Sequence, residues 1–172
     1  MDVKQVLRTL SEAAGVSGYE RELAQLIEAS CPWADDVRTD KLGNVIMLKK
    51  GQGPEPRPKV MLAAHMDEIG LIVTKIEKGG FLRFSTIGGF DKRVLLAQEV
   101  VVHGRQGALS GVIGAKPPHI QAPGEQSKAV KMEDLFIDAG FAGREEAEQF
   151  VQIGDLVTIK RPVTNLNGSY MS

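Results

Sequence analysis

The apolar positions of the first thirty residues repeat with the period of an α-helix. The first apolar stripe stands at i, i+3, i+4 and i+7 and consists of Val3, Val6, Leu7 and Leu10. A glycine-containing interruption over 15–18 separates it from a second stripe, made of Leu23, Leu26 and Ile27. Ser17 and Glu20 have the spacing of a capping box, so we expect a second helix to begin there and to end at Cys31-Pro32.

The pattern then changes to short β-type runs. We predict strands over 37–39 and 45–48, joined by a turn at Leu42-Gly43-Asn44. A proline-rich loop follows, and 60–64 is an uninterrupted apolar run. Such a run is typical of a strand buried on both faces of an α/β sheet. A turn of buried helix is the alternative, which the preceding prolines disfavour.

From residue 69 onward, glycine pairs and turns separate a longer series of β-type runs. The predicted strands are 71–76, 81–86, 100–102, 108–113, 135–137 and 156–159, with one helix over 144–150. This series is typical of a small antiparallel barrel or sandwich. We therefore expect an α/β segment over 1–68 and a β domain over 69–162, while 165–172 shows neither a strand pattern nor a cap.

Composition and charge narrow the class of protein. The chain has 172 residues, 42% of them hydrophobic, and a net charge of −1 from 21 basic and 22 acidic residues. This balance gives no field that would attract nucleic acid or an anionic membrane surface, so neither partner is expected. No apolar run reaches the roughly 20 residues of a membrane span. One cysteine, Cys31, excludes an internal disulfide framework, and we expect a soluble, cytoplasmic protein.

Candidate chemistry follows the apolar run, where His65 and Asp67 interrupt a buried pattern. Open α/β sheets place ligands at the carboxyl ends of their strands. A neutral imidazole there can bind a divalent metal, and a nearby carboxylate can orient the ring. Asp67 lies two residues after His65, so an extended backbone directs both side chains to one side. The alternative is a histidine satisfied at a strand end, with Asp67 capping the next turn.

Other polar residues are weaker candidates. His119 follows Lys116-Pro117-Pro118 and is expected to be exposed in a loop, with a substrate contact as the alternative. His103 is interpreted as a surface residue rather than a ligand. Cys31 precedes a proline and has no basic neighbour, so we expect an unreactive thiol. Adjacent glutamates at 145 and 146 point in different directions on a helix and are interpreted as a solvated face.

The segment Ala64-His65-Met66-Asp67-Glu68-Ile69-Gly70 resembles a motif of the tetrahedral-type aminopeptidases. Members of this metallopeptidase family are often labelled glutamyl aminopeptidase or endoglucanase. Ordered matches to the family extend along nearly the whole chain, at 17–20, 40–44, 88–91, 112–119, 134–138 and 151–155. Several matches in order are far more specific than a His-x-Asp pair alone.

The resemblance implies an α/β metallopeptidase catalytic domain, of which 1–68 is the first part and 163–172 the start of the return. An inserted β-barrel domain over 69–162 would mediate dimerisation, with dimers assembling into a dodecamer that trims peptides from the N-terminus. Two divalent metal ions, zinc or cobalt, would share a bridging carboxylate and activate a water. His65 corresponds to a histidine ligand of one metal, and Asp67 to the acidic catalytic residue that orients the site.

The family's bridging aspartate, paired glutamates and second histidine lie beyond the β domain and have no counterpart in these 172 residues. We therefore expect an N-terminal fragment of a metal-dependent aminopeptidase that does not hydrolyse peptides alone. A non-catalytic oligomerisation module is the first alternative. An endoglucanase is the second, and it is disfavoured because no pair of carboxylates is placed to flank a glycosidic bond.

Overall fold

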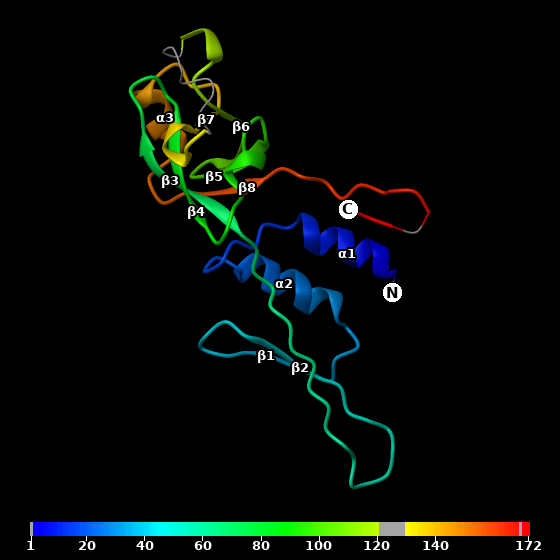
Figure 1. Cartoon of the computed structure of the whole chain (residues 1–172). Coiled ribbons are helices and arrows are strands. Elements are labelled where there is room, and N and C mark those ends of the chain that lie inside the picture. Colours follow the sequence, from blue (N-terminus) through cyan, green and yellow to red (C-terminus); the bar gives the residue numbers. More distant parts are fainter. Residues whose placement is uncertain (1, 121–129, 169) are drawn as a thin grey trace. The chain divides into compact units, whose positions relative to one another are not determined.

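The computed structural model describes residues 2–120, 130–168 and 170–172 (Figure 1). The chain divides into two compact units. Unit 1 comprises residues 1–68 together with 163–172, and unit 2 comprises 69–162.

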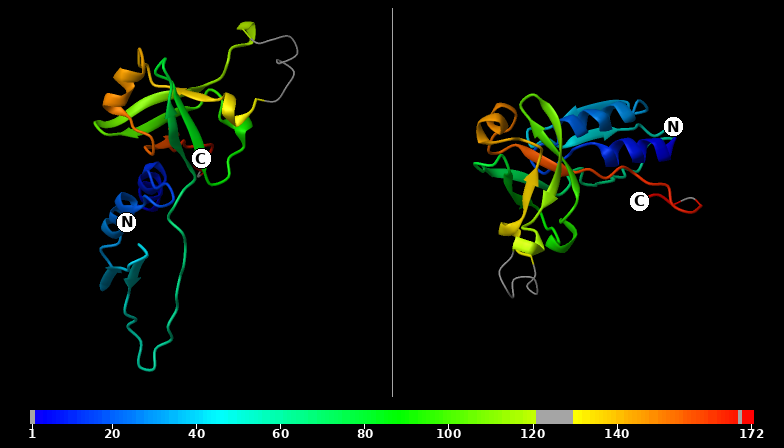
Figure 2. Two further views of the ribbon diagram at one scale, coloured as in Figure 1. Left: turned by 90° about the vertical axis from the view of Figure 1, so that its left-hand side faces the viewer. Right: turned by 90° about the horizontal axis from the view of Figure 1, so that it is seen from above.

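Unit 1 begins with two helices, α1 (Val3–Glu12) and α2 (Arg21–Ser30), which lie side by side (Figures 1 and 2). Asp2 caps α1, because its carboxylate accepts the backbone N–H groups of Lys4 and Gln5. Leu23 on α2 is buried, as expected. Of the apolar stripe of α1, Val3 and Leu7 are more than half accessible, whereas Val6 and Leu10 are half-buried. The predicted helices are therefore present, but the described residues cover the stripe of the first only in part.

The predicted capping box of α2 is wrong. α2 begins at Arg21 after Glu20, and no side chain caps its first turn. The Ser17 hydroxyl donates instead to Asp67 Oδ2 at 2.5 Å, and Glu20 Oε1 accepts the N–H of Gly18 at 2.7 Å. The local spacing assigned the Ser17 hydroxyl to the first turn of the helix, but this hydroxyl is bonded to Asp67, fifty residues away in the sequence.

The two predicted short strands are present as β1 (Asp36–Thr39) and β2 (Val45–Leu48), and they form an antiparallel pair. The turn between them is built on Asp40, whose Oδ1 accepts the N–H groups of Leu42 and Asn44. Gly43 has a φ of +87°, a conformation that glycine adopts without steric cost. An aspartate side chain thus holds the hairpin in register.

The predicted buried strand over 60–64 is wrong. These residues belong to no strand, and Val60, Met61 and Leu62 are 83%, 88% and 93% exposed. A strand exists only where a neighbour supplies hydrogen bonds, and no part of the described chain pairs with this run. The apolar composition of 60–64 indicates side chains suited to burial, but in this structure they are exposed.

The returning segment of unit 1 runs beside α1. Arg8 Nη1 donates to the carbonyl oxygen of Val163 at 2.8 Å, and the N–H of Val163 donates to Glu12 Oε1 at 2.8 Å. Farther along, Asn165 and Met171 form an isolated antiparallel bridge.

Unit 2 is a closed six-stranded antiparallel barrel with one helix, α3 (Arg144–Phe150), on its outside (Figures 1 and 2). The strands are β3 (Gly70–Ile76), β4 (Leu82–Ile87), β5 (Glu99–Gly104), β6 (Gly107–Gly114), β7 (Phe136–Asp138) and β8 (Leu156–Ile159). Their order around the barrel is β3-β4-β7-β6-β5-β8, and β8 pairs with β3 to close it. Short 3₁₀ turns occupy Lys92–Val94, Pro118–Ile120 and Met132–Asp134. The predicted α/β class with a small β-barrel is confirmed.

Alternate residues of the strands fill the barrel interior. The buried core comprises Leu71, Val73, Ile76, Leu82, Phe84, Leu95, Val100, Val102, Ile113, Leu135, Ile137, Ala147, Val151 and Val157. Ala147 lies on α3 and Val151 directly follows this helix. Since both side chains are buried in the core, α3 packs against the barrel through the helix face that carries Ala147. Gly80, in the β3–β4 turn, has a φ of +86°, and a Cβ there would lie 2.7 Å from the carbonyl oxygen of Phe141.

Among residues 2–120, 130–168 and 170–172, no helix has the length and apolar character to cross a membrane.

Candidate functional site

The candidate site is built where the loop before α2 meets the segment that leads out of unit 1. The N–H of Glu68 donates to the carbonyl oxygen of Gly15 at 2.8 Å, and the N–H of Ser17 donates to the carbonyl oxygen of Glu68 at 3.3 Å. Between them, Val16 is buried and forms a parallel bridge with Glu68. The Glu68 carboxylate also accepts the N–H of Gly15 at 3.2 Å. These bonds hold residues 65–68 against the loop 15–18.

His65 is oriented through one ring nitrogen. Its Nδ1 lies 3.0 Å from Asp67 Oδ1 and 3.0 Å from the backbone oxygen of Asp67. Both partners are acceptors, so Nδ1 carries a proton, and in the neutral tautomer the lone pair is on Nε2. The side chain is 85% exposed, and Nε2 has no partner within the described part of the chain. The sequence correctly predicted that His65 and Asp67 lie on one side.

Asp67 connects this histidine to Ser17. Its Oδ2 accepts the Ser17 hydroxyl at 2.5 Å, while Oδ1 faces the imidazole. The hydrogen bond from Ser17, followed by that from His65, lowers the pKa of Asp67 below its ordinary value. The carboxylate is therefore ionised at neutral pH and favours a proton on Nδ1. Ser17, Asp67 and His65 form one hydrogen-bonded row.

This row has the chemistry of a metal-ligand histidine with its supporting carboxylate. Histidines that bind metals donate their other ring N–H to a carboxylate or carbonyl, which fixes the tautomer and raises the basicity of the ligating nitrogen. Zinc sites use three or four protein ligands. Within the described residues, no group of three or more His, Cys, Asp or Glu side chains is placed to hold a metal ion. His65 therefore fits a metal as one ligand of a larger set.

The weaker candidates lie outside this row. His103, on β5, is half-buried rather than on the surface, and its Nε2 lies 3.0 Å from Thr158 Oγ1. His119 is exposed in the 3₁₀ turn Pro118–Ile120, as expected. Cys31 is half-buried at the end of α2. Glu146 is exposed on α3, and its carboxylate accepts the N–H of Ala142.

Comparison with known proteins identifies the family in which the Ser17–Asp67–His65 row occurs. Residues 43–172 match the family described as M42 glutamyl aminopeptidase. The chain belongs to this family. The tetrahedral-type aminopeptidase resemblance seen in the sequence is thereby confirmed.

Relatives of the M42 chain include two aminopeptidases. The lysyl aminopeptidase of Pyrococcus furiosus is 40% identical over 150 residues, which cover 84% of this chain and 42% of that protein. The glutamyl aminopeptidase of Lactococcus lactis is 29% identical over 161 residues, which cover 91% of this chain and 45% of that protein. The chain thus spans less than half the length of these relatives.

Solved structures of the M42 type agree with the fold. The TET aminopeptidase of the archaeon Thaumarchaeota archaeon SCGC AB-539-E09 has a TM-score of 0.89 at 42% identity, covering 96% of this chain and 46% of that one. The TET1 peptidase of Pyrococcus horikoshii, which can assemble into a tetrahedron or a large octahedral shell, has a TM-score of 0.82 at 36% identity, covering 98% and 50%. A Thermotoga maritima protein named endoglucanase has a TM-score of 0.77 at 38% identity, covering 94% and 47%.

Proposed function

We propose that this chain contributes one side of the active site of a metal-dependent aminopeptidase. The observation that carries the proposal is the geometry of His65, whose Nδ1 is held by Asp67 and whose Nε2 is open to a ligand. Membership of the M42 family and the aminopeptidase relatives support it. The substrates are proposed to be peptides that lose their N-terminal residue.

The proposed cofactors are two divalent metal ions, zinc or cobalt. His65 would bind one of them through Nε2, and the bound ions would polarise the peptide carbonyl and activate a water. Asp67 acts as a positioning residue, because it holds the imidazole in the tautomer that exposes Nε2. Ser17 keeps the Asp67 carboxylate in place through its hydroxyl.

The two units are proposed to have different roles. Unit 1 would belong to the catalytic α/β domain, and the barrel of unit 2 would mediate dimerisation within a larger homo-oligomer. The assembly of the Pyrococcus horikoshii TET1 peptidase supports this second role. Because the described residues supply one candidate histidine and no complete ligand set, the 172-residue chain by itself is proposed not to hydrolyse peptides.

A chimera tests the proposal. This chain would replace the matching N-terminal region of the Pyrococcus furiosus lysyl aminopeptidase, leaving the rest of that protein unchanged. The expected result is hydrolysis of lysyl-p-nitroanilide that a chelator abolishes and added metal restores. His65→Ala in the chimera should remove this activity, because it deletes the proposed ligand.

His103→Gln serves as the matched control, since this histidine lies in the barrel and contacts Thr158. It should leave the activity unchanged. A folded chimera in which His65→Ala keeps full activity would contradict the proposal. Chelator-insensitive cleavage of carboxymethylcellulose, in place of the anilide, would favour the endoglucanase alternative.

A further inference from the structure

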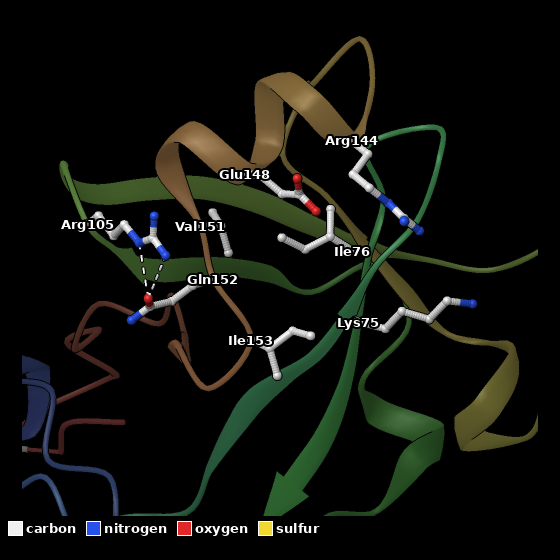
Figure 3. A pocket seen from close by; sticks show the side chains of 8 residues that line it. All are labelled: Lys75, Ile76, Arg105, Arg144, Glu148, Val151, Gln152 and Ile153. Carbon is white, nitrogen blue, oxygen red and sulfur yellow. Dashed lines mark hydrogen bonds between the residues drawn. The ribbon is translucent and has the colours of Figure 1, made fainter.

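Unit 2 contains a cavity of about 480 Å³ whose lining includes neither His65 nor Asp67 (Figure 3). It is formed by the end of β3, the turn between β5 and β6, the outer turns of α3 and the segment that follows α3. Its volume falls within the range of sites that hold small ligands, roughly 300 to 1,000 Å³.

Two opposite charges line this cavity without satisfying each other. Arg144 and Glu148 are four residues apart on α3, a spacing at which oppositely charged side chains can pair. Neither charged group has an ion-pair or hydrogen-bond partner within the described residues. Arg144 Nε is buried and has no hydrogen-bond acceptor. An unpaired buried N–H costs free energy, whereas Glu148 is exposed and its carboxylate is open to solvent or to a ligand.

The remaining walls are apolar or already paired, and the Lys75 Nζ of this lining lies 3.6 Å from Glu77 Oε1. Ile76 and Val151 are buried side chains of the floor, and Ile153 is 67% exposed at the rim. Arg105 donates through Nε and Nη2 to Gln152 Oε1, at 3.0 and 2.8 Å (Figure 3). The cavity therefore presents an apolar surface beside one unpartnered cation and one unpartnered anion.

We propose that this cavity binds a zwitterion with an aliphatic side chain, either an aliphatic amino acid or a short peptide that ends in one. The carboxylate of the ligand would accept hydrogen bonds from Arg144, and its ammonium group would donate to Glu148. The aliphatic group would cover Ile153 and the floor. A phosphate fits less well, because Glu148 would repel it and the two other cations of the lining, Lys75 and Arg105, already have partners in Glu77 and Gln152.

A zwitterion uses both charged groups of the lining. A plain fatty carboxylate would make no favourable contact with Glu148, and an alkyl amine would make none with the Arg144 guanidinium. The ligand class includes products that an aminopeptidase releases. That connection rests on the proposed function, whereas the binding itself does not.

Isothermal titration calorimetry of the 172-residue chain with L-leucine tests the proposal, in the presence of EDTA so that no metal-bound ligand contributes. Leucinamide, which lacks the carboxylate, and N-acetyl-leucine, which lacks the ammonium group, should each bind at least about tenfold more weakly than leucine. Leucyl-leucine distinguishes a short peptide from a free amino acid as the ligand, because whichever of leucyl-leucine and leucine binds more tightly fits the cavity better. Absence of leucine and leucyl-leucine binding up to their solubility limits would overturn the proposal.

Variants assign the binding to this cavity. Glu148→Gln should weaken leucine about tenfold and leave N-acetyl-leucine unchanged, because only the ammonium contact is lost. Arg144→Gln should weaken both, and circular dichroism checks that it folds. Glu145→Gln, an exposed neighbour on α3, and His65→Ala should bind leucine like the parent chain. Equal leucine affinity in the parent and in Glu148→Gln would contradict the proposal, whatever the chimera shows about peptidase activity.

Discussion

His65 illustrates how a single side chain is prepared for a ligand. Two acceptors, the carboxylate and the backbone oxygen of Asp67, both face its Nδ1. They leave Nε2 as the nitrogen with a free lone pair, and the ring is 85% exposed. An exposed histidine usually samples both tautomers. Here Asp67, held by Ser17, selects one tautomer before a ligand binds, so binding does not have to supply the free energy of that selection.

Zinc titrated into the 172-residue chain is expected to bind at one weak site, because the described residues provide one candidate ligand histidine, His65, and no complete ligand set. His65→Ala should abolish this site. Asp67→Asn should lower the affinity by about tenfold, as loss of a supporting carboxylate does. Competition with a chromophoric chelator measures both effects. His103→Gln should leave the affinity unchanged, and tight stoichiometric binding would show that further ligands exist.

Asp91 provides a pH-dependent test elsewhere in unit 2. Its carboxylate accepts hydrogen bonds from the side chain and the backbone N–H of Arg93, and these lower its pKa from 3.8 to about 2. A lowered pKa means that ionised Asp91 stabilises the folded chain. This contribution is complete above pH 3.8 and is lost as the pH falls toward 2.

Arg93→Ala should return the pKa of Asp91 toward 3.8, and the acid edge of stability should move to higher pH. Carbon-13 NMR titration of the aspartate carboxyl groups measures the shift directly. Arg161→Ala is the control, because its guanidinium contacts Gln98 and not Asp91. An unchanged titration of Asp91 in Arg93→Ala would contradict this account.

Single residues also show where sequence reasoning reached its limit. The pairing of His65 with Asp67 was predictable, since it follows from two-residue spacing in an extended backbone. The role of Ser17 was not, because its partner lies fifty residues away and its local spacing matched a capping box. The cavity beside α3 was likewise not predictable, since three segments that are far apart in the sequence build its walls.

Between helices and strands, close backbone contacts limit which side chains the chain can carry. Gly104 ends β5 where the chain meets the last turn of α3. A Cβ at this position would lie 2.4 Å from the carbonyl oxygen of Phe150. That same oxygen accepts the N–H of Arg105 at 2.8 Å, so it is not free to move away.

Gly104→Ala is therefore expected to destabilise the chain by about 1–3 kcal/mol, the usual cost of forced overpacking. Urea unfolding followed by circular dichroism measures the free energy of unfolding. Gly89→Ala should cost far less, because a Cβ there has open space and the φ is not positive. Equal stability of Gly104→Ala and the parent chain would show that the α3 contact is loose.

Elements were predictable where the chain itself supplies their partners. The barrel strands and α3 follow from β-type runs, glycine turns and one Glu-rich helix pattern, and each strand pairs with two neighbours. The run 60–64 has the same apolar character and forms no strand. Its pattern was read correctly as apolar, but pairing depends on residues that the pattern does not contain.

For the molecule as a whole, that unpaired run has a consequence in solution. Val60, Met61 and Leu62 form a contiguous exposed apolar segment with free backbone donors and acceptors. Such a segment favours pairing with another chain. We expect the 172-residue chain to form large associated species that grow with concentration.

Replacing Met61 and Leu62 with serine should remove the largest species, and sedimentation velocity over a range of concentrations measures the change. A dimer held by the barrel, as proposed above, should persist in this variant. Leu42→Ser is the control, because Leu42 is 89% exposed in the β1–β2 turn, outside the run. An unaltered size distribution after both substitutions would exclude 60–64 as the contact.

The closure of the barrel by β3 and β8 has a further consequence for how such proteins change over evolution. Leu71 pairs with Val157 and Ile72 with Leu156 in an antiparallel ladder, so the first and last strands of unit 2 enter and leave at the same end. Because the two ends of the barrel are adjacent, inserting it into another domain separates the flanking residues no more than a short hairpin would. The loop-closure entropy of the insertion is therefore small. It can be exchanged, enlarged or transplanted as a cassette through one pair of neighbouring splice points, without re-routing the chain around it.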